Sequence, residues 1–382
     1  MRVSALGQKR AFDRRDTVPS SLARGLSLPA PAAYNQSGED AQIEQGETMT
    51  HRTLAFVLTL LLAGGAAFAA HHEEAASTDA TAQVTTEQFE AWMAEISNWG
   101  RWGEEDELGT LNLITAEKRK SAAALVEDGI SVSMALDLNK TKGPANASPF
   151  EHALSVVEIE NQTGVVDYYG VNYHGYSHSH LDGLTHFVHK GKMYNGFPQE
   201  GLKETGAERL GIENAHAGIF TRGVLVDMAW LKGVDYLPGD TVITADDLEA
   251  WEAKTGVKIQ SGDVLLLRTG RWDRVREEGP EAFLTSAAGM HASVAAWLKA
   301  RDVAVIGCDG ISDALPSGVE GRPNPLHELV LVGLGMMILD NLDLDGVAKE
   351  AKDRGRWEFL FVGAPLRVPG GTGSPLNPLA VF

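Results

Sequence analysis

Apolar residues along this chain follow two periodic patterns, which predict alternating strands and helices. Near-continuous apolar runs at 263–268 and 303–308 are typical of strands covered on both faces of a sheet. Alternating runs predict further strands at 132–138 and 154–160, and residues 156–169 resemble a hairpin. Helices are predicted at 86–96, 115–127, 244–254 and 287–300. This order predicts an α/β fold with a mixed sheet and flanking helices.

The N-terminal part of the chain has a different pattern. Residues 1–48 are rich in Ser, Ala, Pro, Gln and Arg and have no sustained apolar period. A basic start at Met49, an apolar run and small residues around Phe68 predict a secretory signal peptide at 49–69. We therefore interpret 1–48 as a non-native extension, with a genuine disordered extension as the alternative.

Residues 70–84 are then expected to be a flexible linker, and 85–382 the globular domain. A cleaved signal peptide predicts a periplasmic or secreted protein that is not held in the membrane.

Composition excludes several classes of function. The 382 residues carry a formal net charge of −19, which argues against nucleic acid as a partner because phosphates require a basic surface. Cys308 is the single cysteine, so neither an intramolecular disulfide nor a thiolate metal cluster can form. The chain has no dinucleotide-binding glycine motif, no G-x-S-x-G and no H-E-x-x-H.

Candidate chemistry is concentrated in residues 174–187, H-G-Y-S-H-S-H-L-D-G-L-T-H-F, which hold four of the twelve histidines. His178, His180 and Asp182 are two residues apart, so on a strand their side chains would share one face. His174 has the same parity if the strand runs straight back to it. Imidazole nitrogens beside a carboxylate are ligands for a divalent metal. The alternative is a structural cluster of histidines.

His186 breaks this two-residue rhythm, because it comes four residues after Asp182. We therefore expect it to act beside a metal rather than as one of its ligands. Phe187 next to it would partly desolvate the imidazole and so favour its neutral form.

Two further groups of residues are candidates for the site. His327 and Asp340 lie at the two ends of an apolar run, and a helix followed by a strand would bring these ends close together at one edge of the sheet. The alternative is that His327 caps a helix and Asp340 is an acidic residue in a turn. Trp102 and Tyr176, together with Trp99, are candidates to line an aromatic substrate pocket, with core packing as the alternative.

The segment H-x-D-x-x-x-H-F at 180–187 resembles the core of the metal-dependent cyclase family, which includes bacterial kynurenine formamidases and isatin hydrolases. Similar segments occur at 102–112, 262–270, 327–342 and 370–375. The resemblance implies a fold of the swivelling β/β/α type, a homo-oligomer, and one or two Zn or Mn ions.

The resemblance also implies roles for individual residues. His180, Asp182 and His327 match metal ligands, His186 matches the acid–base, and Asp340 stands where a glutamate ligand is usual. Tyr176 occupies the place of the family's first ligand, so His178 or His174 would have to replace that ligand, or the site would hold one metal fewer. Strand parity favours His178 as the third ligand. Leu184 stands where the family has proline, and the shorter Asp340 puts a second metal in doubt.

The predicted activity is hydrolysis of a C–N bond in a cyclic amide or an N-formyl arylamine. A metal-activated water would attack this small-molecule substrate, and His186 would move the proton. The alternatives are a lactone or ester hydrolase of the same fold and a periplasmic metal-binding protein without catalysis.

Overall fold

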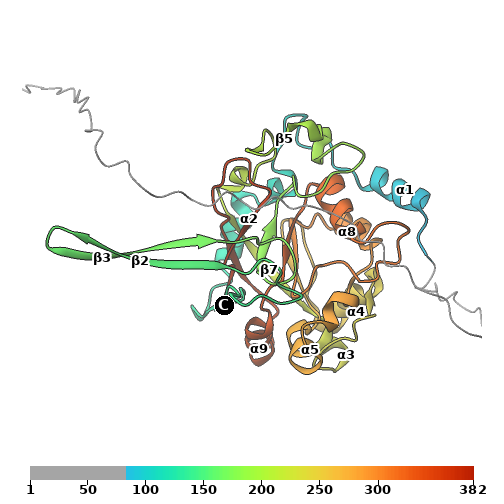
Figure 1. Cartoon of the computed structure of the whole chain (residues 1–382). Helices are drawn as coiled ribbons and strands as arrows, with labels where there is room; N and C mark the ends of the chain where they lie inside the picture. The colour runs from blue at the N-terminus through green and yellow to red at the C-terminus, as the bar shows by residue number, and fades with distance from the viewer. Residues whose placement is uncertain (1–82) are drawn as a thin grey trace, which may run out of the picture. The chain divides into compact units, whose positions relative to one another are not determined.

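A computed structural model describes residues 83–382, which form a large curled mixed sheet flanked by helices (Figure 1). The described residues lie within one compact unit. The extension at 1–48, the signal peptide at 49–69 and the linker up to residue 82 lie outside them. Among the helices of residues 83–382, none is both long and apolar enough to cross a membrane.

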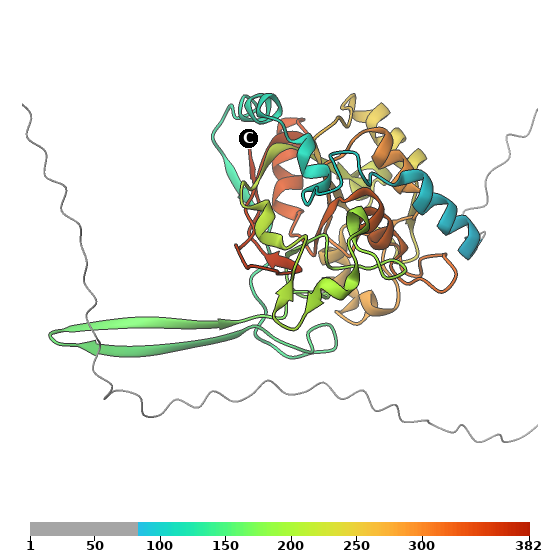
Figure 2. The ribbon, with the colours of Figure 1, turned by 90° about the horizontal axis from the view of Figure 1, so that it is seen from above.

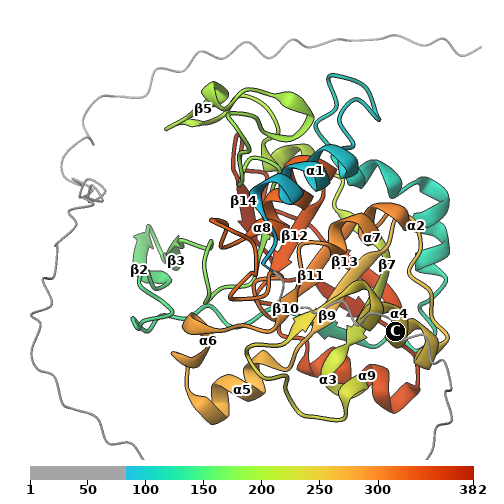
Figure 3. The ribbon, with the colours of Figure 1, turned by 90° about the vertical axis from the view of Figure 1, so that its right-hand side faces the viewer.

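The main sheet has nine strands in the order β1-β15-β13-β7-β9-β11-β12-β4-β14. Its parallel centre consists of β7, β9, β11 and β12, which lie side by side in Figure 3. The other neighbours are antiparallel. The bounds are β1 Ser131–Ser133, β4 His180–Asp182, β7 Ile219–Asp227, β9 Val264–Arg268, β11 Val305–Cys308, β12 Met337–Asp340, β13 Glu358–Gly363, β14 Gly373–Pro375 and β15 Leu379–Val381.

Helices cover this sheet, and α2 and α9 both contact β7. The central strands carry apolar side chains on both faces, so both faces need such cover. Their bounds are α1 Thr86–Ile96, α2 Ala116–Ala123, α3 Met228–Lys232, α4 Ala245–Thr255, α5 Arg271–Glu278, α6 Ala282–Thr285, α7 Val294–Ala300, α8 Pro325–His327 and α9 Asp345–Arg354, with a π-helical stretch at Glu328–Leu334. Two small sheets pair β5 Leu202–Lys203 with β6 Gly206–Ala207 and β8 Val242–Ile243 with β10 Gly289–Met290.

A long hairpin, β2 Glu151–Ile159 and β3 Gln162–Gly170, projects away from the body of the domain (Figures 1 and 2). Its two strands form a sheet of their own. The hairpin expected at 156–169 is therefore present, and it is longer than the sequence pattern indicated.

Other elements differ from the prediction at their ends. The helix expected at 287–300 begins only at Val294, because 289–290 pair with β8 as a strand. The strand expected at 132–138 covers only Ser131–Ser133, and the amide of Leu136 beyond it donates to Ser179 Oγ instead of to a neighbouring strand. Such competition from tertiary contacts is invisible in a local pattern.

Candidate metal centre

Strands β4 and β12 bring three acidic or imidazole side chains to one face of the sheet. The antiparallel register pairs His180 with Asp340 and Asp182 with Ile338. Cross-strand partners and residues two apart share a face, so His180, Asp182 and Asp340 point the same way. Each of the three is at most 2% exposed. Burial of two carboxylates together requires compensation by positive charge.

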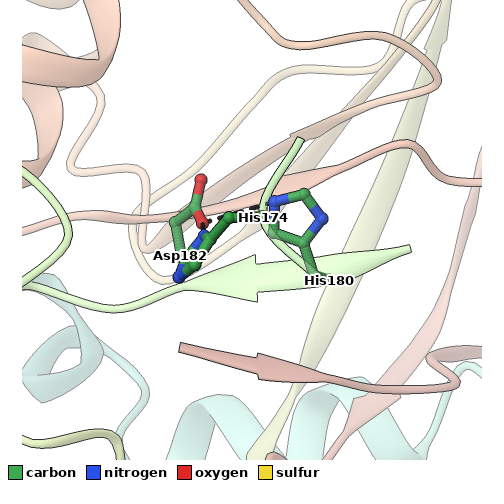
Figure 4. A group of neighbouring side chains, drawn as sticks. All are labelled: His174, His180 and Asp182. Carbon is green, nitrogen blue, oxygen red and sulfur yellow. Dashed lines mark ion pairs between the residues drawn. The ribbon is translucent and has the colours of Figure 1, made fainter. Parts of the chain in front are cut away.

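The loop before β4 adds a second histidine to Asp182. His174 Nδ1 lies 2.8 Å and His180 Nε2 lies 3.3 Å from Asp182 Oδ1, and Figure 4 shows both rings directed at that carboxylate. Asp182 Oδ1 and His174 Nδ1 are both buried without a hydrogen bond of normal geometry. These two donor atoms are therefore placed for a cation.

His327 approaches the same carboxylate from α8. Its Nε2 atom lies 3.5 Å from Asp182 Oδ2 and 3.2 Å from Asp340 Oδ2. The position of α8 is fixed by Asp313, whose carboxylate accepts hydrogen bonds from the amides of Leu326 and His327. Two donor groups result, His174–His180–Asp182 and Asp182–His327–Asp340, and they share Asp182.

Each of the three histidines has its other ring nitrogen held by a partner outside these groups. His180 Nδ1 donates to the carbonyl of His178 at 2.7 Å. His327 Nδ1 contacts the carboxylate of Asp313 at 2.5 Å, and His174 Nε2 lies 3.0 Å from Thr372 Oγ1. Partners of this kind fix the tautomer and orientation of metal-binding histidines.

His186 lies beside the donor groups and belongs to neither of them. Its ring stacks in parallel on His174 with 3.9 Å between centroids, and its Nε2 is 3.7 Å from Asp182 Oδ1. Burial, opposed by Asp182 and reinforced by the neighbouring histidines, lowers the pKa of His186 to about 4. The imidazole is therefore neutral at neutral pH.

The charged groups in the cluster shift the pKa values of Asp182 and His327 in the direction opposite to the effect of burial. Burial raises the pKa of Asp182, but the surrounding histidines hold it well below its usual range. Burial lowers the pKa of His327, but Asp340, Asp182 and Asp313 hold it well above its usual range. Positive charge is thus strongly favoured among these carboxylates, which suits a divalent cation as well as a proton.

His178, which strand parity favoured as the third ligand, is in neither donor group, and His174 takes the place beside Asp182. Parity fails because the chain becomes a strand only at His180, while Gly175 turns with a positive φ of 127°. The His178 ring is buried, and neither of its nitrogens has a hydrogen-bond partner.

A buried polar network holds this loop in place. Arg271 donates to the carbonyl of Tyr176 at 2.7 Å and also contacts the side chain of Asn341. Asn341 in turn donates to the carbonyls of Gly175 and His178 at 2.6 and 3.2 Å. Because Asn341 directly follows Asp340, the network joins the loop to β12.

Two cavities meet beside the loop. One, of about 240 Å³, is lined by residues 144–148, 172 and 174–178. The other, of about 590 Å³, shares Tyr176 and Ser177 with it and includes Arg271 and Trp272. Tyr176 therefore lies where a substrate could reach it. Trp102 lines neither cavity and packs against Arg101, whose guanidinium carbon is 4.6 Å from its ring centroid.

Sequence reasoning did not identify Asp313 and Thr372 as partners of the histidines. One available signal was the position of Asp313 just after the buried strand β11, where side chains gather at the end of a parallel sheet. Thr372 lies in a glycine-rich segment that has no such pattern.

Comparison with known proteins supplies an independent view of the fold. A family model described as "Putative cyclase" matches residues 124–313. The isatin hydrolase of Roseibium aggregatum is 32% identical over 152 residues, which cover 37% of this chain and about half, 53%, of that protein. A crystal structure of a novel cyclase is 30% identical with a TM-score of 0.70, over 76% of this chain and 99% of the other.

Proposed function

This chain belongs to the cyclase family, and from that membership we propose that it is a metal-dependent hydrolase that cleaves the C–N bond of a cyclic amide or an N-formyl arylamine. The isatin hydrolase to which part of this chain is similar supports this substrate class, since isatin is itself a cyclic amide.

One observation carries the proposal. Three histidines each have one ring nitrogen held by a separate partner, and their other nitrogens converge on the buried carboxylate of Asp182. Asp182 Oδ1 and His174 Nδ1 form an ion pair at 2.8 Å, and neither atom has a hydrogen bond of normal geometry, so both can serve as donors to a cation. Mixed nitrogen and carboxylate donors suit Zn or Mn.

His174, His180 and Asp182 would hold one ion, and His327 and Asp340 would complete the site through the shared Asp182. A cation at this position supplies Lewis-acid polarisation of a carbonyl and makes water more acidic. Asp313 and Thr372 contact the other ring nitrogens of His327 and His174 and would hold these two rings oriented toward the ion.

His186 acts as the acid–base in this proposal. Its neutral imidazole accepts the proton of the attacking water and later delivers a proton to the leaving nitrogen. The stack on His174 holds the His186 ring beside the donor atoms, with Nε2 near Asp182. Tyr176 lines the adjoining cavities and is the aromatic residue placed to contact the substrate.

The test combines metal analysis with a substrate screen on the same preparations. Wild-type protein should contain Zn or Mn and hydrolyse members of a panel of cyclic amides and N-formyl arylamines, with lactones and esters as comparison. Asp182→Ala should lose both metal and activity. Full metal occupancy in that variant contradicts the ligand assignment, and turnover confined to lactones or esters contradicts the C–N assignment.

A further inference from the structure

The larger of the two cavities beside the candidate metal centre has no part in the reaction described so far. Its volume is about 590 Å³, and its lining comes mainly from the segment 136–140, from Tyr176 and Ser177, and from α5 with Pro280. Pockets that hold drug-sized ligands measure about 300 to 1,000 Å³. The adjoining cavity of about 240 Å³, which His174 lines, is smaller than that. A substrate therefore has room for its reacting group beside His174, but for a larger group only in the 590 Å³ cavity.

The two cavities meet close to the donor atoms of the candidate centre. Tyr176 and Ser177 line both of them. His174, whose Nδ1 atom is 2.8 Å from Asp182 Oδ1, lines the smaller one. Two residues of chain span at most about 7 Å, so the backbone of Tyr176 lies within that distance of His174. A substituent of a few atoms would therefore reach from the donor groups into the larger cavity.

The walls of the larger cavity are mainly apolar, and its aromatic side chains are held in place by other parts of the domain. Trp272 Nε1 donates to the carbonyl of Leu342 at 2.7 Å. The ring of Tyr176 packs edge-on against Phe283, with 5.8 Å between the ring centroids. The other apolar residues of the lining are Leu136, Leu138, Ala145, Val275 and Pro280. A fixed apolar wall of this kind is typical of a preformed ligand pocket.

The charged residues of this cavity do not favour an ionic ligand. Asp137 and Lys140 have opposite charges and lie on the exposed segment 136–140. Arg271 is buried, and its guanidinium donates to the carbonyl of Tyr176 and to the side chain of Asn341. Its positive charge is therefore engaged by protein atoms. The ligand group that complements such a cavity is uncharged and apolar.

We propose that the substrate carries an apolar substituent, about as large as a butyl or phenyl group, that occupies the 590 Å³ cavity. Leu138 and Val275, which line the cavity from two different segments, determine which substituents are accepted. This inference rests on the proposed function for the reacting amide, but it concerns the part of the substrate that does not react. The substrate class is thus a cyclic amide or N-formyl arylamine whose ring bears an apolar group.

The test compares isatin and N-formylaniline with derivatives that carry a butyl or phenyl group at each position of the benzene ring in turn. Each methylene that is buried strengthens binding by roughly 4-fold. The best-placed substituent should therefore raise kcat/KM of the wild type by about 10-fold or more over the unsubstituted compound. This ratio is taken within one protein, so it does not depend on the overall activity of a preparation.

Two variants place an indole ring in the lining. Val275→Trp and Leu138→Trp should each lower the preference for the substituted compound to about twofold or less, because the indole takes the space of the substituent. Leu138 is 39% exposed, so its replacement leaves the core intact. The matched control, Glu277→Trp, adds the same ring to α5 at an exposed position outside the lining and should keep the preference of the wild type.

Binding measurements separate this inference from the proposed reaction. The same compounds are titrated by calorimetry into the His186→Ala protein and into versions of it that carry each tryptophan, so that dissociation constants are obtained without turnover. A 10-fold preference in binding, roughly the gain expected from burial of the substituent, together with no hydrolysis by the wild type would contradict the C–N hydrolase assignment and support the apolar cavity. Equal or absent binding of both members of every pair, a preference that survives both cavity variants, or one that is lost in Glu277→Trp would each overturn the inference.

Discussion

Replacement of Asp313 by asparagine should weaken metal binding although Asp313 is not itself a proposed ligand. The carboxylate is 1% exposed, and its Oδ2 atom accepts from both the amide and Nδ1 of His327 while Oδ1 accepts from the amide of Leu326. An asparagine has one oxygen for these three donors. If its NH₂ group faces His327, the imidazole must accept at Nδ1 and carry its proton on Nε2.

In that tautomer the Nε2 atom of His327 carries a proton and cannot coordinate the metal. Loss of such a supporting carboxylate typically lowers metal affinity by about 10- to 100-fold, which corresponds to about 1.4 to 2.8 kcal/mol. The folded state should lose roughly 1 to 3 kcal/mol in addition, because a buried hydrogen bond to a charged group disappears.

The assay is competition between the protein and a chelator of known affinity, with Zn and with Mn, alongside urea unfolding of the metal-free protein. The matched control is Asp227→Asn, which removes another buried carboxylate that caps α3 through the amide of Trp230 and pairs with Arg268. It should lower stability but leave metal affinity unchanged. Metal affinity of Asp313→Asn within twofold of wild type, or an equal loss in the control, would refute this reasoning.

Three further predictions concern other parts of the molecule. His186→Ala should keep its metal but lose about 100- to 10,000-fold in kcat, whereas joint loss of metal and turnover would make it a ligand. Arg271→Lys removes the planar fork that holds the carbonyl of Tyr176 and should lower kcat by about 10-fold or more through a misplaced loop; full activity would contradict a positioning role. Burial raises the pKa of Glu252, but hydrogen bonds from a backbone amide, Lys258 and Arg301 hold this pKa below its ordinary 4.5. The ionised Glu252 carboxylate therefore stabilises the folded state fully above about pH 4.5, and this stabilisation is lost as the pH falls through the lowered pKa. The stability difference between wild type and Glu252→Gln, roughly 1 to 3 kcal/mol at pH 7, should therefore shrink below about pH 4.5 in urea unfolding, and a difference independent of pH would contradict this.

Much of the fold was accessible to sequence reasoning because local signals and tertiary structure agree. Thr85 caps α1 through the amide of Gln88, and the helix then spans the predicted residues 86–96. The apolar run at 263–268 is β9 at the centre of the sheet, where both faces are covered. The expected α/β class, with a mixed sheet and flanking helices, is confirmed.

The arrangement of the candidate site was less accessible, since it depends on contacts between distant segments. Two-residue spacing correctly places His180 and Asp182 on one face of β4. It fails for His178, because Arg271 and Asn341 shape the preceding loop from elsewhere in the chain. No periodicity in the sequence could indicate that restraint.

Strand β4 lies between β12 and β14, both of which are made much later in the chain. Asp340 follows Asp182 by 158 residues (positions 340 and 182). At roughly 5 to 20 residues per second, a ribosome needs on the order of 10 to 30 s to cover that distance. During this interval the emerging chain carries His180 and Asp182 without either neighbouring strand. The complete set of candidate donors therefore exists only after β12 has been synthesised, and β4 obtains both of its neighbouring strands only after β14 has followed.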